Sequence, residues 1–281
     1  SAYYQPGPGN ASYVDWDALT AWSASQIIHT QWQHLLNELL WQEAGQQLVI
    51  NIIGFSRGAA LARHFANQIL DATQGHWFSF TDEFGKQYEG CISPHFMGLF
   101  DTVAQFGLLG SNNHLYNLSI APEWAWVAHA VALNEYRPIY PLYGIDTDAQ
   151  RVQAGFIGNH GDLGGGQSYV GTATAQGDLH KIPLAWMVWQ AKTLGLSFAL
   201  EGLEQVQQPI LHDARAPMLR YLATDRNVQE GLLSTPQRLH PEIGQAVRNE
   251  VEALIKRYGD WQIRRSHDVG TVDLADYYAW L

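Results

Sequence analysis

Residues 48–58, which read LVINIIGFSRG, constrain the fold more than any other stretch of this chain. An apolar, β-branched run leads into Gly54-Phe55-Ser56-Arg57-Gly58, and the alanine-rich segment 59–66 that follows favours a helix. The pattern predicts a buried strand, a sharp turn and a helix, with Ser56 at the apex of the turn. This is the G-x-S-x-G pattern in the strand–turn–helix context that exposes a nucleophilic serine. We expect both glycines to be required, because Cβ atoms flanking the serine would clash in such a turn.

Composition limits the class of protein. The 281 residues are 46% hydrophobic and 15% charged, enough for one large α/β domain or two small ones with a sizeable core. A net charge of −11 argues against nucleic-acid binding and against a polybasic membrane anchor. The single cysteine, Cys91, excludes an intramolecular disulfide framework. The sequence contains no 18-residue apolar run and no signal-peptide pattern at its start, so we expect neither a membrane span nor a secretory leader.

Strand and helix patterns alternate along the first 200 residues. We predict strands at 48–53, 95–100 and 151–157, and helices at 57–71, 122–134, 184–195 and 241–258. Residues 15–44 are predicted to form one long helix or two in series, and residues 72–94 a loop or a short excursion. This alternation favours an α/β fold of the α/β-hydrolase-like class, with a mostly parallel sheet covered by helices on both faces. Strand signals are fewer after residue 200. We therefore expect a catalytic core over 1–200, with 201–281 either the end of the same domain or a small appendage.

Three predicted strands end in the residue types of a hydrolase triad. Ser56 follows the first strand, Asp101 the second and His160 the third. The carboxyl ends of parallel strands meet at one edge of a sheet, and the order Ser, Asp, His is that of α/β-hydrolases. A serine hydroxyl becomes a nucleophile only when a base takes its proton, and a carboxylate must orient that base. We therefore predict Ser56 as nucleophile, His160 as base and Asp101 as acid.

Each of these assignments has an alternative. The turn at Ser56 can be an ordinary βα turn, Asp101 can cap a loop or a helix, and eleven other histidines compete with His160. Asp162 is a rival acid, although a loop-ordering role suits its position better. The glycine-rich segment 161–166 has no lysine and lacks the phosphate-binding spacings, so we expect no nucleotide. No metal-ligand spacing stands out either, and we predict no metal and no cofactor.

An acyl pocket and an oxyanion site are expected beside the nucleophile. The backbone N–H of Arg57, directly after the serine, is the predicted oxyanion donor. Phe55 from the turn, and Phe106, Leu108 and Leu109 from the loop after Asp101, are predicted to line an apolar substrate pocket. The high aromatic content of the chain fits such a pocket, but the usual burial of aromatic rings favours an aromatic-rich core as its explanation.

Four segments together carry a family resemblance. GFSRGAA, GLFDTV, GNHGDLGGG and IPLAWMVWQA resemble, in this order, the bacterial α/β-hydrolase domain found in Tle-type phospholipase effectors of type VI secretion. AHAVALNEYRPIYP and YYQPGPGN resemble two further blocks, so the resemblance covers roughly residues 3–200. It implies the same triad and the hydrolysis of a lipid ester. The family usually begins with a strand ending in F-D-G-T, which these residues lack, so we expect the second oxyanion donor near Gly7 to Asn10.

The resemblance also implies partners and a place of action. It implies a lipid or ester substrate, transient contact with a membrane surface, and an immunity protein or secretion-apparatus partner. A protein made in the bacterial cytoplasm and delivered to a target-cell periplasm fits this family. Two other functions stay open: a catalytically idle hydrolase-fold module for binding or toxin partnership, and a small-molecule esterase or thioesterase.

Overall fold

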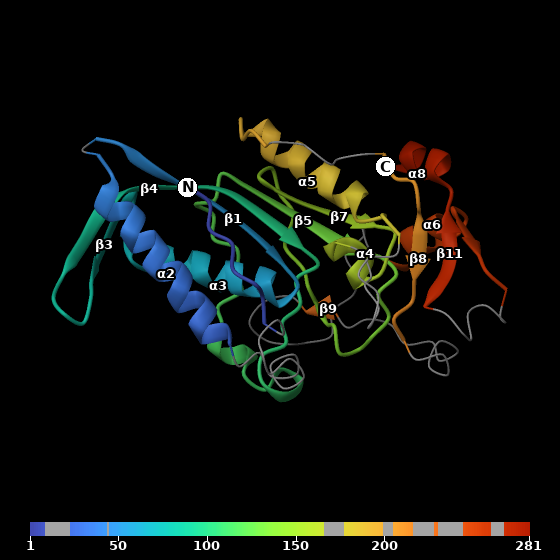
Figure 1. The fold of residues 1–281 in the computed structure, drawn as a ribbon, viewed down its shortest axis with the longest axis horizontal. Coiled ribbons are helices and arrows are strands. Elements are labelled where there is room, and N and C mark those ends of the chain that lie inside the picture. Colours follow the sequence, from blue (N-terminus) through green and yellow to red (C-terminus); the bar gives the residue numbers. More distant parts are fainter. Residues whose placement is uncertain are drawn as a thin grey trace. The chain divides into compact units, whose positions relative to one another are not determined.

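The computed structural model describes residues 1–8, 23–43, 45–165, 177–198, 205–215, 228–229, 244–259 and 267–281 (Figure 1). These residues form two compact units, Ser1–Val127 and Ala128–Leu281, and each is described by itself. These units do not test the predicted organisation into a catalytic core over 1–200 and a C-terminal part, which stays a prediction. None of the helices in the described ranges is long and apolar enough to cross a membrane.

The sheet of the first unit is mixed rather than mostly parallel. It contains β1 (Gln47–Phe55), β2 (Thr73–Gln74), β3 (Trp77–Thr81) and β4 (Gln87–Phe100). β1 runs parallel to β4, whereas β3 is antiparallel to both β2 and β4. The expectations of a mostly parallel sheet and of a loop over 72–94 are therefore wrong here. That segment is largely a β-hairpin, in which Phe78 and Tyr88 face the core between exposed neighbours.

Helices α2 (Ala24–Trp41) and α3 (Arg57–Asp71) pack on this sheet. They contact each other, α2 contacts β4 and α3 contacts β1 (Figure 1). They share one hydrophobic cluster with the strands, made of Leu35, Leu36, Leu39, Ile69, Phe78, Tyr88 and Ile92. The bounds of α3 are those predicted for it, and α2 is the described part of the helix predicted over 15–44; residues 15–22 lie outside the described ranges.

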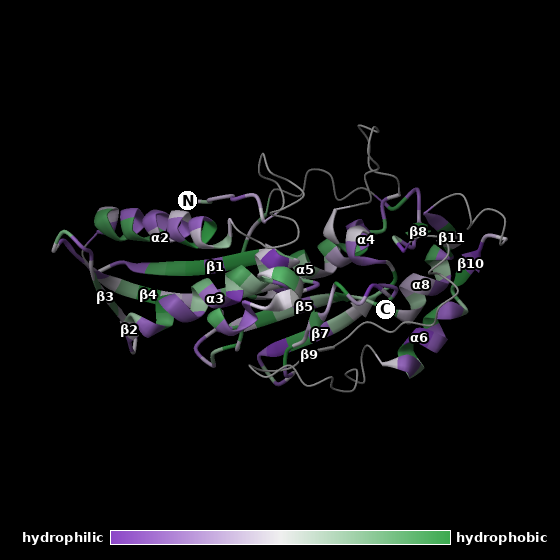
Figure 2. Cartoon of the chain, turned by 90° about the horizontal axis from the view of Figure 1, so that it is seen from below, coloured by the Kyte–Doolittle hydropathy of each residue, from purple (hydrophilic) through white to green (hydrophobic). Residues whose placement is uncertain are grey.

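Among the described residues, α2 and α3 cover one face of β1. Leu48, Ile50 and Ile52 pack against the hydrophobic cluster, so both helices serve the same face of the strand. Val49 and Ile53, which point the other way, are 49% and 53% exposed. Figure 2 shows β1 coloured largely as hydrophobic, while α2 carries both hydrophilic and hydrophobic residues. The predicted strand is present, and cover by helices on both faces of the sheet stays a prediction.

One predicted helix, in the segment where the first unit ends and the second begins, is a strand. β5 (Trp126–Ala132) stands where a helix was expected over 122–134, and it is a neighbour of β7 (Arg151–Phe156). Every residue from Val127 to Ala132 is buried, as in a strand covered on both faces. A short apolar run of this kind has no period that separates a strand from a helix. β7 confirms the strand predicted over 151–157.

The remaining elements lie in the second half of the chain. α5 (Lys181–Thr193) confirms the helix predicted over 184–195, and β6 (Leu142–Tyr143) pairs in parallel with β9 (Val228–Gln229). β8 (Ile210–His212), β10 (Ile255–Arg257) and β11 (Asp268–Val272) form an antiparallel sheet in the order β10-β11-β8.

Two helices complete this half of the chain. The helix predicted over 241–258 is shorter, because α6 (Gln245–Glu252) gives way to β10. α8 (Leu274–Trp280) is tied to the end of β7 by the buried Tyr277 hydroxyl, which accepts the Ile157 N–H at 2.9 Å.

Candidate active site

Ser56 occupies a strained turn between β1 and α3. Its backbone has φ 59° and ψ −129°, and Ser56 and Asp101 are the non-glycine residues with positive φ in the described ranges. The Ser56 N–H donates to the Phe100 carbonyl at 2.9 Å, and the Ser56 carbonyl accepts the Val103 N–H at 3.2 Å. A non-glycine residue in this region costs about 1–3 kcal/mol, and such strain concentrates at functional sites. The end of β4 therefore holds the serine in the conformation expected of a nucleophile turn.

The two glycines of the motif have different roles. A Cβ atom on Gly54 would lie 2.6 Å from the Ala59 Cα and 2.6 Å from the Gly58 carbonyl oxygen, so β1 and α3 approach too closely for a side chain there. A Cβ atom on Gly58 would meet nothing within 4 Å. The expectation that both glycines are sterically required is correct for Gly54 and wrong for Gly58.

This difference predicts opposite outcomes for two matched substitutions. Gly54→Ala is expected to lower the free energy of unfolding by about 1–3 kcal/mol, because backbone atoms must move to admit the methyl group. Gly58→Ala is expected to leave it unchanged or raise it by up to about 1 kcal/mol, because alanine is the better helix former. Urea unfolding of the two variants beside the parent chain measures both. Equal losses in the two variants would contradict this account of the turn.

Asp101 lies at the same edge of the sheet as Ser56. In the parallel pairing of β1 with β4, Phe55 is the partner of Phe100, so Ser56 and Asp101 are the residues that directly follow a paired position. The Asp101 residue is fully buried and has φ 44°, a second strained backbone at this edge. A buried carboxylate is costly unless polar groups surround it, so its position calls for a specific role.

His160 is the first residue of α4 (His160–Gly164), after the end of β7. Only 6% of the residue is exposed, its N–H donates to the Glu135 Oε2 at 3.2 Å, and its ring centroid lies 4.9 Å from that of Tyr140. Glu135 in turn accepts two hydrogen bonds from the Arg137 guanidinium, at 2.8 and 2.7 Å. This guanidinium lies 3.9 Å from the Tyr140 ring centroid. The sequence analysis missed Glu135, which follows β5; the signal was an acidic residue just after an apolar run.

The loop that carries His160 is ordered by Asp162. Asn159 and Asp162 form a capping box, in which the Asn159 side chain accepts the Asp162 N–H at 2.9 Å and Asp162 Oδ2 accepts the Asn159 N–H at 3.0 Å. Asp162 also accepts the backbone N–H of His212 at 3.0 Å and lies 2.5 Å from its Nδ1. These contacts support the loop-ordering role considered for Asp162.

His212 is a buried histidine between two carboxylates. Its side chain is 0% exposed, and its Nε2 lies 3.1 Å from Asp268 Oδ1 on the neighbouring strand β11. A carboxylate oxygen therefore lies near each ring nitrogen, and the hydrogen bond is the one between Nδ1 and Asp162. The residue connects β8 and β11 to the loop of His160. Sequence reasoning missed it, because β8 was not predicted.

The predicted triad is divided between the two units. Ser56 and Asp101 belong to Ser1–Val127, and His160 belongs to Ala128–Leu281. The structure brings the predicted nucleophile and acid to one sheet edge, and it places the predicted base on an ordered loop after a strand. The complete triad stays a prediction. Across the described ranges, no group of three or more His, Cys, Asp and Glu residues is arranged to hold a metal ion.

The surroundings of Arg57 are partly described. Its guanidinium donates to the Pro8 carbonyl at 3.1 Å, so the N-terminal segment lies beside the residue after the nucleophile. Proline has no N–H, and Pro8 therefore supplies no oxyanion donor. Gly9 and Asn10 fall outside the described residues. The Arg57 N–H and the segment from Gly7 to Asn10 stay predictions as oxyanion donors.

The residues predicted to line an acyl pocket have different environments. Phe55 is half-buried, and Phe106 is 1% exposed, with its ring stacked on Tyr116 at a centroid distance of 3.9 Å. Leu108 begins the short 3₁₀ helix η1 (Leu108–Gly110) and is 61% exposed. The side chain of Leu109 lies outside the described part of the structure. The pocket itself stays a prediction.

Comparison with known proteins identifies one family. Residues 73–190 match the family model described as "T6SS, Phospholipase effector Tle1-like, catalytic domain". The matched range contains Asp101 and His160, and Ser56 precedes it. The resemblance to the catalytic domain of Tle-type effectors is thereby confirmed. No curated protein matches this chain.

Two solved structures are similar to parts of the chain. One is the Tle1 effector bound to the VgrG spike of the type 6 secretion system, at 24% identity and a TM-score of 0.41, covering 59% of this chain and 35% of that one. The other is an uncharacterized protein from Pseudomonas aeruginosa, at 21% identity and a TM-score of 0.39, covering 86% of this chain and 33% of that one. The chain spans about a third of the length of each.

Proposed function

Because residues 73–190 resemble the catalytic domain of type VI secretion phospholipase effectors, we propose that this chain is a serine esterase of the α/β-hydrolase class. Its substrate is an acyl ester of a phospholipid or another lipid. One observation carries the proposal: Ser56 and Asp101 follow the paired residues Phe55 and Phe100, and both have a positive φ. Strain at two adjacent strand ends is expected where a nucleophile and its acid are positioned.

The reaction follows the roles of the three residues. His160 takes the proton of the Ser56 hydroxyl as its oxygen attacks the ester carbonyl, and Asp101 orients the imidazole and stabilises its charge. The tetrahedral oxyanion accepts a hydrogen bond from the Arg57 N–H at the start of α3, where the helix dipole favours negative charge. His160 then protonates the leaving alcohol. Water, activated by the same histidine, hydrolyses the acyl-serine and regenerates the enzyme.

The ordered surroundings of His160 support its role as the base. The capping box of Asn159 and Asp162, the hydrogen bond to Glu135 and the buried His212 fix the backbone on which the imidazole is carried. A base works only when it is held within hydrogen-bonding reach of its partners, so a rigid loop is an advantage. Phe55, Phe106, Leu108 and Leu109 are the proposed lining of the acyl pocket.

A fluorophosphonate probe tests the proposal directly. Incubation of the full chain with the probe, followed by proteolysis and mass spectrometry, is expected to place one covalent adduct on Ser56. Release of fatty acid from phospholipid vesicles is expected to exceed the hydrolysis of acetyl esters and thioesters. No adduct at any serine would favour the idle binding module. An adduct on Ser56 with activity only toward short esters or thioesters would favour the small-molecule hydrolase.

The family also suggests where such an enzyme acts. We include in the proposal a transient contact with a membrane surface, delivery into a target-cell periplasm, and partners among the secretion apparatus and immunity proteins. Co-purification of the full chain with tagged secretion-apparatus proteins and tagged immunity proteins tests the proposed partners.

A further inference from the structure

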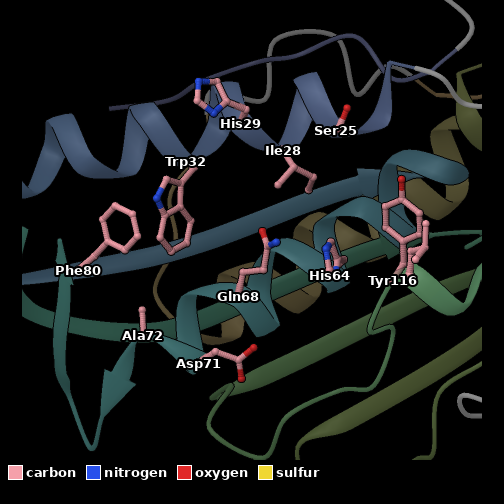
Figure 3. A pocket seen from close by; sticks show the side chains of 11 residues that line it. Ser25, Ile28, His29, Trp32, His64, Gln68, Asp71, Ala72, Phe80 and Tyr116 are labelled. Atoms are coloured by element: carbon pink, nitrogen blue, oxygen red, sulfur yellow. The ribbon is translucent and has the colours of Figure 1, made fainter. Parts of the chain in front are cut away.

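A pocket of about 670 Å³ lies between α2 and α3 in the first unit (Figure 3). Neither Ser56 nor Asp101 lines it. The volume is within the range of about 300–1,000 Å³ that is usual for small-molecule sites. Nothing in the proposed esterase mechanism uses this pocket, so it is available to a separate ligand.

One wall of the pocket is apolar and aromatic. Ile28 and Trp32 project into it from successive turns of α2, and Phe80 adds a ring from β3 (Figure 3). The rings of Trp32 and Phe80 meet edge to face, with centroids 5.3 Å apart, and both side chains are half-buried. Aromatic faces attract organic cations as well as apolar groups, and tryptophan does so best.

The opposite wall is polar and comes from α3. His64, Gln68 and Asp71 are spaced by four and three residues, so they share one face of the helix. His64 Nδ1 accepts the Asn117 N–H at 3.1 Å, and burial lowers the His64 pKa, while the nearby charge of Asp71 opposes that shift. The imidazole is therefore neutral at pH 7, and its remaining proton is on Nε2.

Asp71 gives the pocket its charge. Its carboxylate is exposed and has no hydrogen bond or ion pair with any residue in the described ranges. No lysine or arginine is among the described residues that line the pocket. The Asp71 carboxylate would therefore repel an anion in the pocket, and no positively charged side chain among the described lining residues would attract it. A cation would find a carboxylate on one wall of the pocket and the aromatic rings of Trp32 and Phe80 on the other.

We propose that this pocket binds a small organic cation, in which an ammonium group is attached to an aromatic or alkyl body. The ammonium group pairs with Asp71, and the body packs on Ile28, Trp32 and Phe80. The Gln68 amide and the His64 Nε2–H offer hydrogen bonds to a polar substituent. Because the lining excludes the nucleophile turn, the proposal does not rest on the esterase function.

Two small molecules with the same body and opposite charge test the site. In titration calorimetry with the full chain, 4-phenylbutylammonium is expected to bind at least about tenfold more tightly than 4-phenylbutyrate, since the Asp71 carboxylate attracts the cation and repels the anion while the shared body makes the same apolar contacts. Asp71→Asn is expected to lower the affinity for the cation by about tenfold. Glu83→Gln, which removes an exposed carboxylate elsewhere in the same unit, is the matched control and should change nothing.

A pocket-filling variant and an active-site variant complete the experiment. Gln68→Trp is expected to abolish binding of the cation while thermal unfolding shows a folded chain, and Ser56→Ala is expected to bind it as the parent does. Any one of three results would overturn the proposal. They are equal binding of the two ions, an unchanged affinity for the cation in Asp71→Asn, and no binding of the cation at a ligand concentration of about 10 mM, which is high enough to detect weak sites. Asp71 is at the surface, so its variant remains informative even where Gln68→Trp fails to fold.

Discussion

Replacing Ser56 by alanine is expected to reduce ester hydrolysis by about 10⁴-fold or more, because the acyl-enzyme route is lost with its nucleophile. The variant should also fail to react with the fluorophosphonate probe. Alanine has no more difficulty than serine in the positive-φ turn, so the thermal unfolding temperature should stay close to that of the parent. Initial rates with a chromogenic ester, measured at equal concentrations of folded protein, give the ratio.

Ser79→Ala is the matched control for this experiment. Ser79 is an exposed serine on β3 of the same unit, and its loss removes the same hydroxyl group. The ester hydrolysis rate of Ser79→Ala and its labelling by the fluorophosphonate probe should equal those of the parent chain. An active Ser56→Ala enzyme would show that another group performs the attack, and it would remove the basis of the proposed mechanism.

Replacing Asp162 by alanine is expected to lower the free energy of unfolding by about 3–5 kcal/mol, because three buried groups lose their hydrogen-bond partner and each such loss costs about 1–3 kcal/mol. Asp162 is 3% exposed and accepts the backbone N–H groups of Asn159 and His212 as well as the His212 ring contact. The substitution leaves a buried imidazole without its nearer carboxylate and opens the capping box. Urea unfolding followed by circular dichroism measures the loss.

His212→Ala should cost a similar amount, and the double variant should cost clearly less than the sum of the two, because both single changes break the same contact. Asp146→Ala, at an exposed carboxylate of the same unit, is the control and is expected to change the free energy of unfolding by less than about 0.5 kcal/mol. Additive losses in the double variant would show that the two side chains stabilise the loop independently.

The nucleophile turn could be predicted because its information is local. The apolar run, the G-x-S-x-G turn and the alanine-rich helix are consecutive, and the predicted bounds of α3 are those observed. The same holds for β7 and α5, whose patterns are uninterrupted. The role of Gly58 could not be judged in this way, because a glycine is required only when another part of the chain approaches it, and nothing approaches Gly58.

Other elements depended on partners that a local pattern does not contain. β5 was taken for a helix because a run buried on both faces shows neither period, and its neighbour β7 is what makes it a strand. The pattern of residues 72–94 predicts a loop or a short excursion rather than the observed hairpin of β3 and β4, since most residues on the exposed side of these strands are polar. Burial of Phe78 and Tyr88 against the helices decides its conformation.

The sequence by itself determined the serine turn, the strand end with Asp101 and the glycine-rich loop with His160, because each is a short motif with its own backbone requirement. Only the tertiary structure decided that Phe55 pairs with Phe100, which brings Ser56 and Asp101 to one edge. It also decided that His212, 50 residues from Asp162 in the chain, holds the loop of the predicted base. Such pairings depend on which distant groups satisfy each other's buried charges and hydrogen bonds, and no local periodicity specifies them.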